Sequence, residues 1–156
     1  MNVIVILDDK NGMMFNKRRQ SKDQILLSHI LKIIEERQIA ASESECPVLW
    51  MNSYTAKLFD PYPEYCRTDD DFLTKAGQKD FCLVENQHLS PCRGSIQELY
   101  IYRWNRHYPG DFFFDINLKD DIWQLMESEE FAGNSHKKIT LEHYVSSCEN
   151  RKGRAG

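Results

Sequence analysis

The first fifty residues constrain the fold most, because they hold two buried strands separated by a long amphipathic helix. Residues 2–7 are apolar and mostly β-branched, which is typical of a strand buried on both faces of a sheet. A helix is predicted over residues 22–37, where Ser21 caps the first turn and Gln24 completes a capping box. Its apolar face is formed by Ile25, Leu26, His29, Ile30 and Ile33. A second buried strand follows at residues 47–51, so the chain begins as an α/β protein.

The remaining segments predict a sheet of mixed strand direction. Short helices are expected at residues 53–59 and after Thr68, where residues 69–71 are acidic and complement the helix dipole, with an end at Gly77. Further strands are predicted at residues 81–84, 98–103, 112–114, 122–126 and 138–144. We therefore predict a mostly parallel sheet flanked by helices, with an antiparallel C-terminal hairpin. We expect a single domain over residues 1–148 and a disordered tail over residues 149–156.

Composition narrows the classes of partner. The chain has 156 residues, a net charge of −4 and a pI of about 5.7, so its surface repels phosphate backbones and nucleic-acid binding is not expected. The apolar run of residues 3–7 is too short for a signal sequence or a membrane span. We expect a cytoplasmic protein with a small-molecule ligand and no membrane contact. Whether it forms oligomers is left open.

The sequence contains no local metal or nucleophile motif. No two of its cysteines form a CxxC pair, so we expect reduced thiols and neither disulfides nor a zinc knuckle. They are Cys46, Cys66, Cys82, Cys92 and Cys148. The five histidines are not spaced as HxH or HExxH, and no P-loop, GxSxG or dinucleotide-binding glycine motif occurs. We predict no metal site and interpret His29 as a core histidine.

Five segments follow one another in the chain: IVILDDKNG at residues 4–12, PVLWMNSYT at 47–55, LYIYRW at 99–104, YPGDFFFD at 108–115, and Trp123 followed by ESEEF. In this order they resemble segments of the dihydrofolate reductase family. The resemblance covers residues 2–144 and implies a dihydrofolate-reductase-like fold. The chain also resembles short bacterial proteins that carry the label ribonuclease Z. The metallo-β-lactamase-type nuclease of that name needs an HxHxDH motif, which this sequence lacks, so we predict no such activity.

The resemblance implies an NADPH site, but this chain departs from it where phosphates bind. Glu85 and Asn86 replace a glycine pair whose backbone approaches the cofactor, and a carboxylate there repels a pyrophosphate. Asn52 and Ser53 replace a glycine and an arginine, and only Thr55 is retained. We therefore predict a degenerate NADPH site, assign no cofactor, and treat NADPH binding as a hypothesis to test.

Four groups of residues are candidates for a ligand site, and the first is the strand-end set Asn52, Ser53 and Thr55. Asp23 aligns with the acid that holds the pterin ring in the family, although it would equally stabilise the helix N-terminus. A basic cluster of Lys17, Arg18, Arg19 and Lys22 could hold an anionic group or simply be solvated. Tyr102, Arg103 and Trp104 could flank a planar ligand or belong to a packed strand. Residues 133–138 are expected to form a structural turn.

These residues support three hypotheses for function. The first is a binder of a pterin-like or nucleotide-like ligand, held by Asp23, the basic cluster and the flanking Arg103 or Trp104. The second is an NAD(P)H-dependent reductase with Asp23 as polarising acid and proton delivery through water. The third is a protein-interaction module that uses an aromatic surface over residues 100–108.

Overall fold

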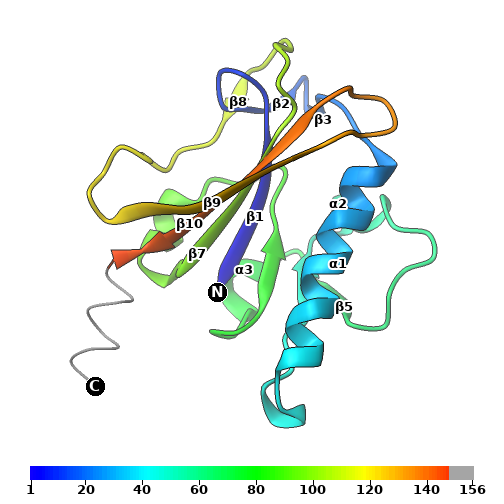
Figure 1. Ribbon diagram of the computed structural model, residues 1–156, viewed down its shortest axis with the longest axis vertical. Helices are drawn as coiled ribbons and strands as arrows, with labels where there is room; N and C mark the ends of the chain where they lie inside the picture. Colours follow the sequence, from blue (N-terminus) through cyan, green and yellow to red (C-terminus); the bar gives the residue numbers. More distant parts are fainter. Residues whose placement is uncertain (148–156) are drawn as a thin grey trace.

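A seven-stranded sheet forms the centre of the computed structural model, which describes residues 1–147 (Figure 1). The tail predicted for residues 149–156 lies outside that part of the chain. The strand order is β5-β4-β6-β1-β7-β10-β9. The strands are β1 (Asn2–Leu7), β4 (Leu49–Met51), β5 (Cys66–Thr68), β6 (Phe81–Leu83), β7 (Glu98–Arg103), β9 (Trp123–Phe131) and β10 (Ile139–Ser146). The five strands from β5 to β7 are mutually parallel, and β10 and β9 close the sheet antiparallel, as the sequence predicted.

Strand β1 lies in the middle of the sheet because it is apolar on both faces. It pairs with β6 on one side and, residue for residue from Asn2 to Leu7, with β7 on the other. Val3 and Val5 belong to the apolar cluster on one face of the sheet, whereas Ile4 belongs to the cluster on the other face. Val3, Ile4 and Val5 are fully buried, so the central strand contributes side chains to the apolar cores on both faces of the sheet.

Helix α1 (Gln24–Ala40) covers one face of the sheet (Figure 1). Its residues Leu26, Leu27, Ile30 and Ile34 are buried in the same cluster as Tyr100 and Leu141. The other helices are short: the single turns α2 (Ser53–Ala56), α3 (Phe72–Lys75) and the 3₁₀ turn η1 (Glu43–Glu45), and the kinked 3₁₀ segment η2 (Ser90–Ser95). Phe72 of α3 packs on the opposite face with Trp123. No helix within residues 1–147 is long and apolar enough to cross a membrane.

A second, three-stranded sheet lies where the parallel strands end (Figure 1). It has the order β3-β2-β8, with β2 (Gly12–Phe15), β3 (Arg18–Arg19) and β8 (Phe112–Phe113). Strands β2 and β3 form a hairpin whose two turn residues, Asn16 and Lys17, have φ of 54° and 63°. Such a turn matches the strand twist, although glycine and asparagine fit it better than lysine. The sequence had not predicted β2, β3 or β5.

Several predicted boundaries were wrong. The cap of α1 is Asp23, not Ser21, because the Asp23 carboxylate accepts the backbone N–H groups of Ile25 and Leu26. Thr68 ends strand β5 instead of capping a helix, and α3 begins after Asp71. The strand expected at residues 122–126 continues to Phe131, so β9 has nine residues. The four cysteines within residues 1–147 are free thiols.

Candidate functional site

The carboxyl ends of the parallel strands meet the small β3-β2-β8 sheet, and buried polar residues gather at this junction. Ligands of open α/β sheets bind outside the carboxyl ends of strands, so this edge is the candidate functional site. Asp8 follows β1, Asn52 follows β4 and Glu85 follows β6. Asp23 is the N-cap residue of α1. All four side chains are at least nine-tenths buried.

Asp8 organises the loops around β1. Its Oδ1 accepts the backbone N–H of Gly12 at 2.7 Å and that of Lys10 at 2.9 Å. Its Oδ2 accepts Gln20 Nε2 at 3.1 Å and the backbone N–H of Tyr108 at 3.2 Å. Burial opposes ionisation, but these hydrogen bonds outweigh it and lower the pKa of Asp8. The carboxylate therefore ties the β1–β2 turn to the segments around Gln20 and Tyr108.

Glu85 closes the end of β6. Arg19 of β3 donates to its two oxygens, from Nε at 2.9 Å and from Nη2 at 3.0 Å. Thr55 Oγ1 donates to Oε1 at 2.8 Å. The Arg19 guanidinium also lies 4.3 Å from the ring centre of Tyr54, whose hydroxyl accepts the Arg19 backbone N–H. The carboxylate that replaces the family's glycine is thus neutralised by the protein itself, and the hairpin is held down on it.

The end of β4 is closed in the same way. Asn52 caps α2 by accepting the backbone N–H of Thr55 at 3.0 Å, and it donates to Asn86 Oδ1 at 2.8 Å. Ser53 donates to Asp70 from both its N–H and its hydroxyl. Asn52 and Asn86, at two of the three positions where the resemblance implies glycines, therefore contact each other and occupy the strand ends.

Asp23 is saturated by protein donors. Besides the α1 cap, its Oδ1 accepts the backbone N–H of Asn134, and its Oδ2 accepts the N–H and the hydroxyl of Ser135 and His136 Nδ1 at 3.2 Å. Burial would raise its pKa, but the hydrogen bonds from Ser135, Asn134 and His136 outweigh burial and hold it well below its usual value. Asp23 thereby pins the loop between β9 and β10 to the start of α1.

Gly133 permits this close approach. A Cβ at that position would lie 2.3 Å from Asp23 Oδ2 and 2.8 Å from Ile139 Cδ1. His136, predicted as part of a plain turn, is 6% exposed and stacks on Trp104 with ring centres 4.2 Å apart. Its Nε2 lies 2.8 Å from the Tyr108 hydroxyl and 3.2 Å from the Ser21 hydroxyl. The turn is therefore part of a buried polar cluster.

The strand part of the aromatic segment over residues 100–108 is buried, whereas residues 105–107 after it are exposed. Tyr100, Tyr102 and Trp104 are at most 4% exposed, and the Tyr102 hydroxyl lies 2.7 Å from His29 Nδ1. Arg103 donates to Glu142 and to Asn11. This burial agrees with the packed-strand interpretation of Tyr102 and Trp104, and the interaction-surface hypothesis stays a prediction. His29 is satisfied as expected, between Tyr102 and a stacked Phe131.

The β2–β3 hairpin carries two exposed cations of the predicted basic cluster, Lys17 and Arg18. Lys17 and Arg18 are exposed and have no ion-pair partner within residues 1–147, whereas Arg19 is paired with Glu85. A cavity of about 480 Å³ lies on one side of the hairpin and one of about 420 Å³ on the other. The first is lined by Phe15, Asn16, Arg18, Arg19, Gln20, Tyr108 and Pro109. Lys17 lines the second with Met14, Asn16, Asn86, Asp111 and Phe112. Lys22 is exposed and lines neither.

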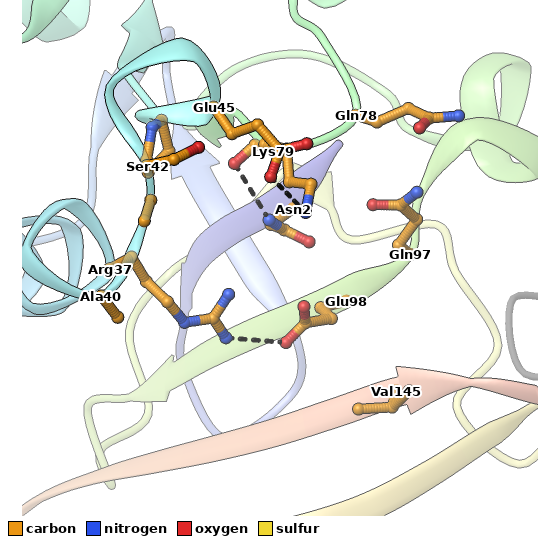
Figure 2. A pocket seen from close by; sticks show the side chains of 12 residues that line it. Asn2, Arg37, Ala40, Ser42, Glu45, Gln78, Lys79, Gln97, Glu98 and Val145 are labelled. Atoms are coloured by element: carbon orange, nitrogen blue, oxygen red, sulfur yellow. Dashed lines mark hydrogen bonds and ion pairs between the residues drawn. The ribbon is translucent and has the colours of Figure 1, made fainter. Parts of the chain in front are cut away.

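A larger cavity, of about 850 Å³, lies at the opposite end of the sheet (Figure 2). It is bounded by the amino ends of β1 and β7 and the last turn of α1. Figure 2 shows the ion pairs Arg37–Glu98 and Lys79–Glu45 around it, with Asn2 between them. No residue predicted from the sequence lies there. No group of three metal-binding side chains occurs anywhere within residues 1–147.

Comparison with known proteins identifies the fold. No protein-family model matches the chain, and no curated protein sequence matches it. Among solved structures, it is similar to dihydrofolate reductase from Enterococcus faecalis in complex with NADP(H) and RAB-propyl. The TM-score is 0.56 at 12% identity, over 93% of this chain and 95% of that chain. The fold is dihydrofolate-reductase-like. At this identity the similarity establishes the architecture and leaves ligand and activity to the residues of the site.

The dihydrofolate-reductase-like sheet brings some predicted site residues together and separates others. Arg19 and Thr55 meet at Glu85, with Asn52 adjacent. Asp23 and Trp104 both contact His136, on the side of the sheet covered by α1. Sequence reasoning missed Asp8, Gly133 and His136. The acid after a buried strand was a usable signal for Asp8, because it lies at the carboxyl end of β1. Nothing local to Gly133 or His136 indicated their contact with Asp23.

Proposed function

We propose that this chain is a divergent member of the dihydrofolate reductase family that binds a small planar anion, pterin-like or nucleotide-like, with a degenerate NADPH site. The observation that carries the proposal is the closure of the β6 end by Glu85, Arg19 and Thr55. A pyrophosphate at that end would be repelled by the Glu85 carboxylate. It could not pair with Arg19, because Arg19 is already paired with Glu85. The family's usual mode of dinucleotide binding is therefore disfavoured.

The hairpin supplies the alternative site. The cavity beside Phe15 and Tyr108 is within the size range of small-molecule pockets, and both aromatic residues line it together with Arg18. A flat ring can lie against an aromatic side chain while its acidic group pairs with the exposed guanidinium. Lys17, at the hairpin turn, adds positive charge on the other side.

Asp23 has a positioning role in this proposal. Both of its oxygens already accept hydrogen bonds from the protein, so holding a pterin ring would require it to release donors of the β9–β10 loop. We therefore place the ligand against the hairpin, with Asp23 stabilising the neighbouring loops. The reductase hypothesis, which needs Asp23 as the polarising acid, is the less favoured one.

A thermal-shift titration with NADPH, NADH, folate, dihydrofolate and common nucleotides tests the proposal. A ligand at one hundred times its Kd stabilises the folded state by about 2.7 kcal/mol. For a chain of this size that raises the melting temperature by about 5–10 °C. We expect such a shift with a folate or a mononucleotide and none with NADPH or NADH. A clear shift with NADPH would refute the inference that the closed β6 end excludes the cofactor. An assay for oxidation of NADPH with dihydrofolate would follow.

Arg18→Ala locates the ligand. Arg18 is exposed and unpaired, so its removal should leave the melting temperature of the free protein within about 1 °C while it reduces the ligand-induced shift. Lys119→Ala, at an exposed position that lines neither hairpin cavity, is the matched control and should leave the shift unchanged. Equal shifts in both variants would show that the ligand binds elsewhere.

A further inference from the structure

Ser21, His136 and Asp23 have the spacing of a serine nucleophile, its base and the carboxylate that orients the base. Ser21 Oγ lies 3.2 Å from His136 Nε2, and His136 Nδ1 lies 3.2 Å from Asp23 Oδ2. The Asp23 side chain is fully buried and that of His136 is 2% exposed, whereas Ser21 is partly exposed. This is the geometry by which such triads are recognised, independent of their order in the chain. We propose that Ser21 is an activated nucleophile for acyl transfer from small esters.

The hydrogen bonds fix the tautomer that this chemistry needs. An ionised carboxylate only accepts hydrogen bonds, so His136 presents a protonated Nδ1 to Asp23. That leaves Nε2 with its lone pair directed to the hydroxyl groups of Ser21 and Tyr108. The stacked Trp104 ring and the Ser135 hydroxyl hold the imidazole from other sides. The base is thus oriented before any substrate arrives.

The residues around Ser21 include a cavity for the substrate and backbone N–H groups for the charge of the tetrahedral intermediate. Gln20, the residue before Ser21, and Tyr108 line the cavity beside Phe15 and Arg18. This cavity suits an ester with a planar or anionic part. The backbone N–H groups of residues 21–23 precede the 17-residue helix α1 and have no hydrogen-bond partner within residues 1–147. They adjoin Ser21 in the chain, and in this proposal they donate to the developing oxyanion.

The reaction balances with water as the only co-reactant. Ser21 Oγ attacks the ester carbonyl carbon while its proton passes to His136 Nε2. The C–O bond to the alcohol then breaks, and the alkoxide takes that proton and leaves. A water molecule repeats the sequence on the acyl-Ser21 ester, which releases the carboxylic acid and restores the serine. This chemistry does not depend on the ligand proposed above, because it needs only the three residues and a small ester.

Covalent labelling by a fluorophosphonate tests the proposal, with labelled peptides identified by mass spectrometry. We expect labelling at Ser21, loss of it in Ser21→Ala, and no change in Ser28→Ala, which removes an exposed serine from helix α1, just after Ser21 in the chain. His136→Gln should slow labelling about 10²-fold or more, because it removes the general base. p-Nitrophenyl acetate hydrolysis should fall in parallel. Absence of label at Ser21 in the wild-type protein would overturn the proposal.

Tyr108→Phe separates activation from mere folding. The Tyr108 and Ser21 hydroxyls compete for the single lone pair of Nε2, so removing the Tyr108 hydroxyl should speed labelling about fivefold. If Ser21 reacted without the base, this variant would leave the rate unchanged or lower it. Asp23→Asn gives the last readout, measured at a temperature where circular dichroism shows it folded.

The charged group that faces His136 is Asp23 at the cap of α1, while Ser21, Trp104, Tyr108 and Ser135 contact it as neutral groups. Loss of the carboxylate in Asp23→Asn should slow labelling and move the midpoint of its pH profile to lower pH. An unchanged midpoint would show that Asp23 acts only through the fold and would refute its part in the triad.

Discussion

The ion pair between Arg19 and Glu85 gives the sharpest test of whether the β6 end is closed, and Arg19→Ala is the perturbation. Glu85 is 8% exposed and accepts two hydrogen bonds from Arg19 and one from Thr55. Removing one partner of a buried pair costs about 3–5 kcal/mol. The Arg19 side chain is 23% exposed, so water replaces part of what is lost and the cost falls to about 2–3 kcal/mol. Loss of the contact with Tyr54 adds about 0.5–1 kcal/mol.

A double-mutant cycle separates the pair from these other effects. Glu85→Gln keeps an oxygen for Thr55 and removes the charge, so the double variant should be more stable than the sum of the single variants predicts, by about 1–2 kcal/mol. Urea unfolding followed by tryptophan fluorescence measures each free energy. The exposed pair Lys138–Glu130 is the matched control, with an expected coupling of about 0.5 kcal/mol or less. An equally small coupling for Arg19–Glu85 would mean that water reaches the carboxylate and that the β6 end is open.

Three further predictions concern the same buried acids. The pKa of Asp23 is lower in the folded state than in the unfolded chain, so its ionised carboxylate stabilises the fold fully above the unfolded pKa of about 3.9. This stabilisation is lost as the pH falls through the folded-state pKa, and the free energy of unfolding should decrease from about pH 5 downward. The decrease should be less steep in Asp23→Asn. Gly133→Ala places a Cβ against the Asp23 carboxylate and should lower the melting temperature by about 4 °C or more, whereas Gly94→Ala, where a Cβ meets nothing within 4 Å, should not. Replacing both Glu85 and Asn86 by glycine removes the carboxylate and both Cβ atoms, so a melting-temperature increase with NADPH should appear in this variant and not in the wild-type protein.

The sheet could be predicted from the sequence where burial leaves a continuous apolar pattern. The bounds of β1 and β7 were predicted to the residue, because each strand has an apolar or aromatic run that is buried between neighbours. Strand β3 has two residues and β5 has three, which is too short for any periodicity. The β2–β3 turn was missed because Asn16-Lys17 lacks the glycine that marks such turns.

The candidate site could be predicted only as far as neighbouring residues determine it. Asp23 was placed correctly at the start of α1, but its partner His136 lies 113 residues later, and no local pattern links the two. Glu85 and Asn86 were recognised as departures from the family's glycines. Their partners Arg19 and Asn52 could not be, because side-chain pairing across strand ends depends on the register of β3, β4 and β6 in three dimensions.

The buried acids near the strand ends all face protein donors, and this determines how a ligand would be held. Asp8 and Asp23 accept hydrogen bonds from loop backbone groups, and Glu85 accepts them from Arg19 of β3, so each carboxylate holds a neighbouring segment in place. What remains for a ligand is the exposed pair of cations on the hairpin, Lys17 and Arg18. Attraction by exposed charges is screened by salt, whereas pairing with buried backbone amides is screened much less. Raising the salt concentration from 50 to 300 mM should therefore weaken binding of an anionic ligand about fivefold. Binding that is insensitive to salt would place the ligand in a buried cleft and contradict the hairpin site.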